Sequence, residues 1–316
     1  MNVRKLLAIA ALAATPAFAR PGETVLGTIT ILDGEVSLLR GSDRLVAAEE
    51  GTRVFDDDVV ETGASRFARL ELAPGPILDL GPATRLLLGP ANDKRDGRAA
   101  LYLLGGWLKI SAADAAARTA VSSPHFDLDD VAGVTLVDVA NDETMLFVES
   151  GSARLADRRA RTPAVKLNAG DFVELRGNGA AVRGQRPAAA FLAKMPVPFR
   201  DSLPSRLATF AERKVAPADA GSFSYKDVVA WLDADRTLGH RLVQAWAAKA
   251  SEPPFRSMLV ANLAAHPEWF PVLYPDCCNA PAAEPRSAAG ASTRAAGPAA
   301  ARPPAPPRLA PPSHNP

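Results

Sequence analysis

The sequence has very little cysteine. Its 316 residues include only two, the neighbours Cys277 and Cys278. Adjacent cysteines close a strained ring if they pair with each other, so the fold is not expected to depend on a disulfide. Two thiolates alone also make an incomplete metal site. We therefore favour a simple exposed pair, with capping, cross-linking or soft-metal binding as the alternatives in an oxidising compartment.

An excess of charge of one sign is also absent. Lys and Arg together number 36 and Asp and Glu 35, which gives a formal net charge of +1. Such a chain has no global field to attract a polyanion or to hold an anionic membrane surface. Nucleic acid is therefore not an expected partner.

The motifs of the common enzyme classes are missing. The sequence has no HExxH, no nucleophile elbow, no Walker loop and no Rossmann glycine pattern. Its four histidines are widely spaced: His125, His240, His266 and His314. Ser122, Ser123 and His125 are close in sequence, but a strand or turn seldom aims such neighbours at one another as a catalytic triad requires. We predict that the protein is not an enzyme.

Acidic residues gather at 56–58 and at 127–130. Carboxylates are ligands that a hard cation such as calcium prefers, but the loop spacing of a known calcium motif is absent. Solvated acidic turns are the preferred interpretation, because β-turns routinely recruit Asp. No metal and no cofactor is predicted.

The first residues have the pattern of an export signal. Arg4 and Lys5 supply positive charge, an apolar run follows at 6–14, and Ala17-Phe18-Ala19 fits a small-x-small cleavage site. Cleavage after Ala19 predicts a signal peptide at 1–19, a mature chain that begins at Arg20, and a periplasmic location. The apolar run is shorter than the roughly 20 residues that cross a bilayer, and no later segment has that length, so no membrane span is expected after cleavage.

Residues 24–186 are predicted to form an all-β domain. Short apolar runs alternate with turn residues such as Asp33-Gly34 and Ser150-Gly151. In the run 66–72, apolar and charged residues alternate as in a strand with one buried and one exposed face. Residues 45–63 and 165–177 echo each other in the order of their apolar and glycine positions. A β-sandwich and a short β-solenoid both fit this pattern.

The remaining chain divides by composition. Four prolines at 187–204 predict a linker. Apolar residues at helical spacing over 225–250 and 255–265 predict a small α-helical segment at 205–276. Trp231 and Trp246 belong to this apolar stripe, and we favour packing over ligand stacking for them. The Pro/Ala-rich segment 277–316 is predicted to be a disordered tail.

The order of short motifs between Thr24 and Ala181 resembles the FecR-like domain family, named for the periplasmic regulator of ferric-citrate uptake. The matching segments are 27–39, 48–72, 80–88, 101–110, 121–124, 148–155 and 165–175. Their motif residues are Gly27, Gly51, Asp58, Thr62, Gly81, Pro82, Gly106, Pro124, Gly151 and Gly170. This resemblance implies a mainly β fold, an all-β FecR-like domain that binds a protein partner or a cell-wall component in the periplasm.

Two departures from the family matter. Gly133–Val137 stands where the family commonly has a "GT.F.V" strand, so a different bend is expected there. The sigma-factor regulators also carry a cytoplasmic helical domain and a membrane span before the β domain, and here a predicted signal peptide takes their place. Contact with a sigma factor is therefore not expected.

The preferred function is an exported, non-enzymatic binding or scaffold protein of the cell envelope. One alternative is an envelope hydrolase acting on the cell wall, in which Asp56, Asp58 and Asp130 would converge in a cleft. Another is a signalling regulator of the ferric-citrate type. The sequence identifies neither the partner nor the oligomeric state.

Overall fold

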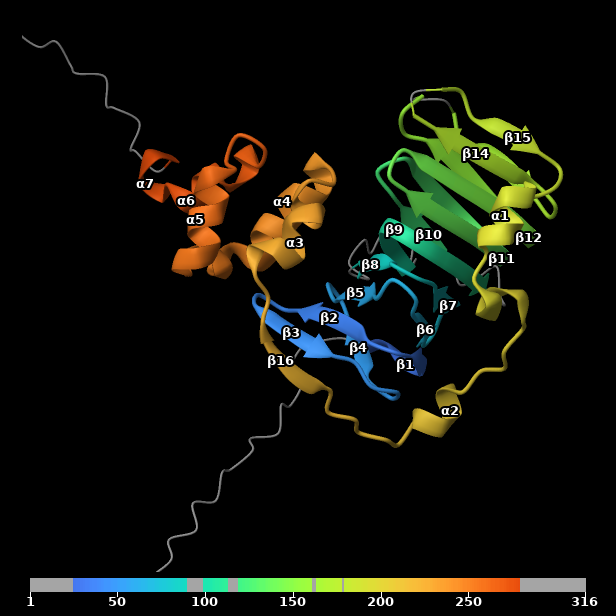
Figure 1. The fold of residues 1–316 in the computed structure, drawn as a ribbon, viewed down its shortest axis with the longest axis horizontal. Helices are drawn as coiled ribbons and strands as arrows, with labels where there is room; N and C mark the ends of the chain where they lie inside the picture. Colours follow the sequence, from blue (N-terminus) through green and yellow to red (C-terminus); the bar gives the residue numbers. More distant parts are fainter. Residues whose placement is uncertain (1–24, 90–98, 113–118, 161–162, 178, 279–316) are drawn as a thin grey trace, which may run out of the picture. The chain divides into compact units, whose positions relative to one another are not determined.

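The structure is a computed structural model, and it describes residues 25–89, 99–112, 119–160, 163–177 and 179–278 (Figure 1). Strands make up most of the chain before residue 185, and short helices follow. The prediction of a mainly β protein with a small helical segment is confirmed. The predicted signal peptide, its cleavage site and the tail from 279 onward lie outside the described residues. The described residues up to Pro275 belong to one compact unit.

Sixteen strands are found in the described residues, and they pair into one sheet. The strands are β1 (Val25–Asp33), β2 (Val36–Arg40), β3 (Arg44–Ala47), β4 (Arg53–Phe55), β5 (Val59–Thr62), β6 (Phe67–Leu72), β7 (Ile77–Leu80), β8 (Arg85–Leu88), β9 (Ala99–Ala112), β10 (Thr119–Ser122), β11 (Phe126–Ala140), β12 (Glu143–Asp157), β13 (Val165–Asn168), β14 (Phe172–Arg176), β15 (Val182–Gly184) and β16 (Ala218–Ser222). Their order is β15-β14-β12-β11-β10-β9-β8-β5-β2-β3-β16, and β1, β4, β6, β7 and β13 pair at its sides.

Neighbouring strands run antiparallel, and of the described pairs only β9 and β10 are parallel. A solenoid of stacked parallel coils is thereby excluded for these strands, because each of its coils would pair in parallel with the next. The long strands β9, β11 and β12 lie side by side and link the early strands to β14 and β15 (Figure 1).

The long hairpin β11–β12 bends sharply at facing glycines. Gly133 and Gly151 are directly opposite and both have positive φ, +80° and +77°. A Cβ at Gly133 would lie 2.4 Å from the Ser150 carbonyl oxygen, and one at Gly151 would lie 2.1 Å from that of Ala132. Only glycine fits such a close approach at this backbone conformation. On one side of this point β11 pairs with β10, and on the other side it pairs with β9.

The main core is built by strict alternation along the strands. Leu70 and Leu72 of β6, Leu78 of β7 and Ile110 of β9 belong to one cluster of buried side chains to which most strands contribute. We call the face that carries these side chains the inner face of the sheet, and the opposite one the outer face. Burial of so many Leu and Val side chains is the main stabilising contribution to the fold.

The helices are short. They are α1 (Ala189–Lys194), η1 (Val197–Arg200), α2 (Leu207–Phe210), α3 (Tyr225–Leu232), α4 (Arg236–Trp246), η2 (Ala247–Ser251), α5 (Pro253–Ala261), η3 (Pro267–Trp269), α6 (Phe270–Leu273) and α7 (Pro275–Cys278). Local signals set their starts: Ser224 and Asp227 form a capping box on α3, and the Asp235 carboxylate accepts the Leu238 N–H at the start of α4. No helix among the described residues is long and apolar enough to cross a bilayer.

The helices cover the outer face of the sheet in two places. Leu39, Val59, Leu87 and Tyr102 of the sheet share a buried cluster with α3, α4 and α5. The second place is covered by the segment predicted as a linker, 187–204, where Phe191 and Phe199 are buried against the sheet. The prolines there limit the segment to short helical turns, and its two aromatic side chains hold it down.

Candidate functional site

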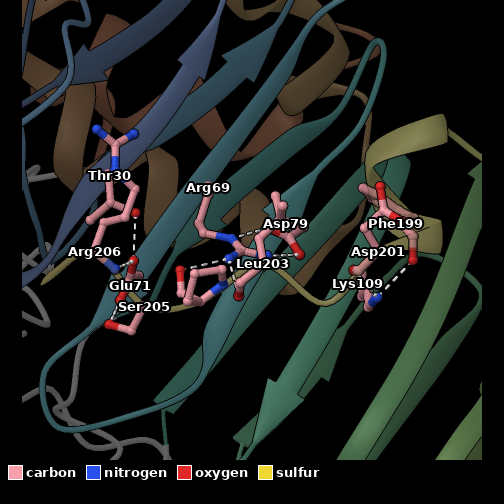
Figure 2. A network of polar contacts seen from close by, with 11 residues as sticks. Thr30, Arg69, Glu71, Asp79, Lys109, Phe199, Asp201, Leu203, Ser205 and Arg206 are labelled. Carbon is pink, nitrogen blue, oxygen red and sulfur yellow. Dashed lines mark hydrogen bonds and ion pairs between the residues drawn. The ribbon is translucent and has the colours of Figure 1, made fainter.

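A row of polar side chains occupies the outer face where β1, β6, β7 and β9 lie side by side (Figure 2). We call this row the polar strip, and its members are Thr30, Arg69, Glu71, Asp79 and Lys109. Each of the five is at most 6% exposed. Four ionisable groups buried together on one sheet face need partners, because an unpaired buried charge is costly.

Strand register brings the charges of the polar strip into line. Asp79 of β7 is directly opposite Arg69 of β6 on one side and Lys109 of β9 on the other. The charges therefore alternate in sign across three strands. Opposite charges at facing positions of antiparallel strands attract each other, so the row supports the strand order.

Arg69 and Asp79 form a two-pronged ion pair. The Arg69 Nε atom lies 2.6 Å from Asp79 Oδ1, and its Nη2 atom lies 2.9 Å from Oδ2. The pair is almost fully buried. Fork-to-fork geometry of this kind strengthens both hydrogen bonds and fixes the guanidinium plane.

The remaining donors of the strip hold the main chain of one segment, residues 196–206, which we call the strap and which begins with the short helix η1. Lys109 Nζ donates to the carbonyl oxygens of Phe199 at 2.7 Å and of Asp201 at 3.2 Å. Arg69 Nη1 donates to the Leu203 carbonyl oxygen at 2.7 Å (Figure 2). The basic groups of the strip thus contact backbone atoms that every residue type carries.

Glu71 holds the far end of the strap. Its carboxylate accepts hydrogen bonds from the Arg206 N–H at 2.8 Å, from the Ser205 hydroxyl, and from the Thr30 hydroxyl at 2.7 Å. Burial opposes ionisation, but these donors outweigh it and lower the pKa of Glu71 below its usual value. The carboxylate is therefore kept charged, in the form that accepts hydrogen bonds.

An aromatic pocket fixes the beginning of the strap. The Phe199 ring meets Phe67 and Trp107 edge to face, with centroids 6.4 and 6.1 Å apart. Phe191 of α1 lies 5.1 Å from the same Trp107 ring. Such rings bury a large apolar area and add an orientational preference.

A buried carboxyl lies beside this aromatic cluster. Asp138 of β11 is directly opposite Trp107 of β9 and Met145 of β12, and 7% of it is exposed. Burial raises the pKa of Asp138 from 3.8 to about 6, against the attraction of Lys194 and with a smaller repulsion from Glu143. This aspartate titrates within the range of mildly acidic media.

Sequence reasoning did not identify the polar strip. It placed Arg69 and Glu71 on an exposed strand face, and that expectation was wrong because the strap covers the face. A signal was present in the single charged residues within the apolar runs 77–80 and 107–110. A lone charge between apolar residues of a short strand indicates a partner on its own face.

The predicted motif residues Asp58 and Thr62 lie within the β framework. The Asp58 carboxylate is buried, forms two hydrogen bonds with Arg40 at 2.7 and 2.9 Å, and accepts the Phe55 N–H. Thr62 donates to the Gly81 carbonyl oxygen at 2.6 Å and accepts the Thr84 N–H. These contacts join the β4–β5 turn and the β7–β8 turn to neighbouring strands.

The other motif residues lie at bends, turns or close approaches. Gly106 has φ +92° and would place a Cβ 2.3 Å from the Thr84 Cα atom. Gly27, Gly51, Gly81, Gly151 and Gly170 also lie at tight or bent backbone, and Pro82 and Pro124 lie in turns before β8 and β11. The structure spreads these residues over the β domain and does not gather them in one cleft.

The acids of the hydrolase hypothesis come from separate parts of the sheet. Asp56 and Asp58 lie between β4 and β5, whereas Asp130 lies in β11, which pairs with β9, β10 and β12. Asp130 lies 3.7 Å from Arg154. No group of three potential metal ligands is present in the described part of the chain.

The Ser122–His125 region forms no catalytic relay. Ser122 donates to Asp127 at 2.8 Å, and the His125 Nδ1 atom lies 2.8 Å from the Thr144 hydroxyl. Burial lowers the pKa of His125, with a further contribution from Arg159. This histidine is therefore held neutral inside the fold.

Side chains of the helical segment contact the sheet through hydrogen bonds. The Asp235 carboxylate accepts the Tyr102 hydroxyl at 2.7 Å and an Arg158 N–H at 3.2 Å, in addition to its capping contact. Trp231 is buried and donates from Nε1 to Glu61 at 2.8 Å. Trp246 packs 5.4 Å from the Phe223 ring, as expected for core aromatics.

Two further surface features, an exposed cysteine and a shallow depression, do not have the shape of a binding site. Cys277 is exposed and not in a disulfide. A shallow, open depression lies at the β11–β12 turn, where Asn141, Asp142 and Arg176 line it. Neither feature has the enclosed, mostly apolar shape of a small-molecule site.

Comparisons with known proteins find structural similarity over part of the chain. No model of a protein family and no curated protein matches the chain. Two crystal structures, at 2.50 and 1.65 Å resolution, are similar in part, and both are titled as a "putative anti-sigma factor" from Parabacteroides distasonis ATCC 8503. Each shows 14% identity and a TM-score of 0.37 over 43% of this chain. The match spans 64% and 63% of those chains, less than two thirds of their length.

Proposed function

We propose that this protein is an exported, non-enzymatic binding module of the cell envelope, built on a β domain of the FecR-like type. The observation that carries the proposal is the polar strip. Its buried charges hold a chain segment by backbone atoms, which is binding chemistry and involves no bond making. The order of the short family motifs and the pattern of the first 19 residues support the domain type and the export.

Two measurements on the native protein test the proposal. Mass spectrometry of the mature chain, purified from fractionated cells, is expected to show an N-terminus at Arg20 and recovery with the periplasm. Chemical cross-linking in intact cells is expected to capture the same envelope partner in replicate preparations. An intact first residue in the cytosolic fraction would refute the export.

The non-enzymatic part of the proposal has its own assay. Purified protein is incubated with isolated cell-wall sacculi, and soluble fragments are followed by chromatography. We expect no release above that of a heat-denatured control. Release that disappears when Asp58 or Asp130 is replaced by Asn would establish the hydrolase alternative instead.

A further inference from the structure

The strap has the properties of a bound peptide. It crosses the outer face of the sheet in contact with the polar strip, and its backbone is held at three carbonyl oxygens and one N–H (Figure 2). Most of its side chains contribute nothing to this contact, since Arg200, Asp201 and Ser202 are exposed. Phe199 is the strap residue that is fully buried.

The strip, in contrast, is a preformed site. Arg69 is oriented by its ion pair with Asp79, and Glu71 by Thr30, so both depend on sheet residues as well as on the strap. The Phe67 and Trp107 rings that hold Phe199 also belong to the sheet. A rigid face with oriented donors, an oriented acceptor and an aromatic pocket binds a peptide segment at low entropic cost.

We propose that the polar strip is a peptide-binding groove which the strap fills in the isolated chain and which a segment of an envelope partner, with the same short helical turn around its aromatic residue, fills in its place. The segment offers an aromatic residue for the Phe67–Trp107 pocket. Four and five residues later it has an apolar residue and a proline, followed by a hydroxyl side chain for Glu71, as in Phe199, Leu203, Pro204 and Ser205. This inference rests on the proposed function and assigns its site.

The strap competes with a free peptide for the groove, and this competition determines the affinity expected for the peptide. A tethered segment acts at an effective concentration of the order of millimolar, so a free peptide binds the wild-type chain only in the small fraction of molecules whose groove is open. Weakening the strap raises that fraction and tightens binding in proportion. Removing a donor of the groove weakens the strap and the free peptide alike, so its effect on the peptide is measured in a variant whose groove is already mostly open.

The probe is a fluorescein-labelled synthetic peptide with the sequence of residues 196–207, and binding to the full-length protein is followed by fluorescence anisotropy. Phe199→Ala in the protein is expected to tighten binding by about tenfold or more relative to wild type, because the open fraction rises. The milder Phe199→Leu, measured in parallel in case the first variant does not fold, is expected to give a smaller change in the same direction. The matched control is Val197→Ser, at an exposed position of the same strap, which is expected to bind as wild type does.

A second substitution tests the groove. Lys109→Met, added to either Phe199 variant, removes the donor to two strap carbonyls and is expected to weaken peptide binding by about tenfold, as loss of a charged hydrogen-bond donor does. A peptide with Ala in place of its Phe is expected to lose binding to a similar extent.

Several results would overturn the inference. One is the absence of saturable binding to variants that keep the wild-type circular dichroism spectrum and melt cooperatively. Another is concentration-dependent dimerisation of the Phe199 variants, which would assign the groove to a second copy of this chain. If the peptide fails to bind while cross-linking in cells still captures a partner, the proposed function stands and only the assignment of the binding site to the polar strip is refuted.

Discussion

Replacing Asp138 by Asn is expected to stabilise the protein in a strongly pH-dependent way. The carboxyl is buried at the aromatic cluster, where burial moves its pKa from 3.8 to about 6. Because each pKa unit corresponds to 1.36 kcal/mol, keeping Asp138 ionised in the folded protein costs about 3 kcal/mol more than in the unfolded chain. Solvent near the carboxyl screens part of this cost, so about 3 kcal/mol is an upper limit.

The sign of the pH dependence of stability follows from the number of protons that the folded and unfolded states bind. Below about pH 4 the carboxyl is protonated in both states and contributes no penalty. Between about pH 4 and pH 6 the folded protein retains a proton that the unfolded chain has released, so the free energy of unfolding falls as pH rises. Asn is uncharged, like the protonated acid, so the free energy of unfolding of the variant does not fall in this way as pH rises. The gain from Asp138→Asn is therefore expected to rise from near zero at about pH 4 to at most about 3 kcal/mol at about pH 8.

Urea unfolding followed by tryptophan fluorescence at several pH values measures the effect, with the slope of each transition checked for two-state behaviour. The matched control is Asp142→Asn, whose carboxylate is 92% exposed and which should change stability by less than about 0.5 kcal/mol at any pH. Equal stabilisation by Asp138→Asn at both ends of the pH range would refute the ionisation argument. So would a loss of stability at high pH.

Three further substitutions test other parts of the fold. Gly133→Ala forces a Cβ against the backbone of the strand that bears Gly151, at 2.4 Å, and is expected to cost more than about 4 kcal/mol, measured as lost soluble yield and a lower melting temperature. Asp79→Asn leaves the buried Arg69 without its carboxylate and is expected to cost about 3–5 kcal/mol in urea unfolding; a change below about 1 kcal/mol would contradict the buried ion pair. Asp235→Ala removes a helix cap and two contacts to the sheet, so we expect a loss of about 2 kcal/mol or more and faster hydrogen exchange in α4, with β11 amides as the internal reference.

Local sequence signals indicated part of the secondary structure. Alternation over 66–72 predicted strand β6, and helical spacing over 225–250 predicted a helix that the structure divides into α3, α4 and η2. The segment predicted as a linker, 187–204, contains the short helices α1 and η1. These features depend on side-chain direction and backbone freedom over a few residues, which the sequence carries directly.

The polar strip was beyond such reasoning. Whether Arg69 faces water or protein depends on what lies over the strand, and that is a segment 134 residues away in the chain. The strap is recognised mainly through its backbone, so its own side chains carry little pattern that reveals the contact. The lone charges in the apolar runs 77–80 and 107–110 and the aromatic residues of the Phe199 pocket leave a trace in the sequence, but none of them identifies the segment that covers the strip.

The sequence alone determined the mainly β class and the change to helices after the prolines, because hydrophobic periodicity and proline conformation are local properties. The predicted turn at Ser150-Gly151 was wrong, since both residues lie within strand β12. The tertiary structure decided that the strands join in one sheet and that the later chain folds back over its outer face. It also decided that four charges are buried there together. Burial depends on which distant surfaces meet, and no local pattern specifies that.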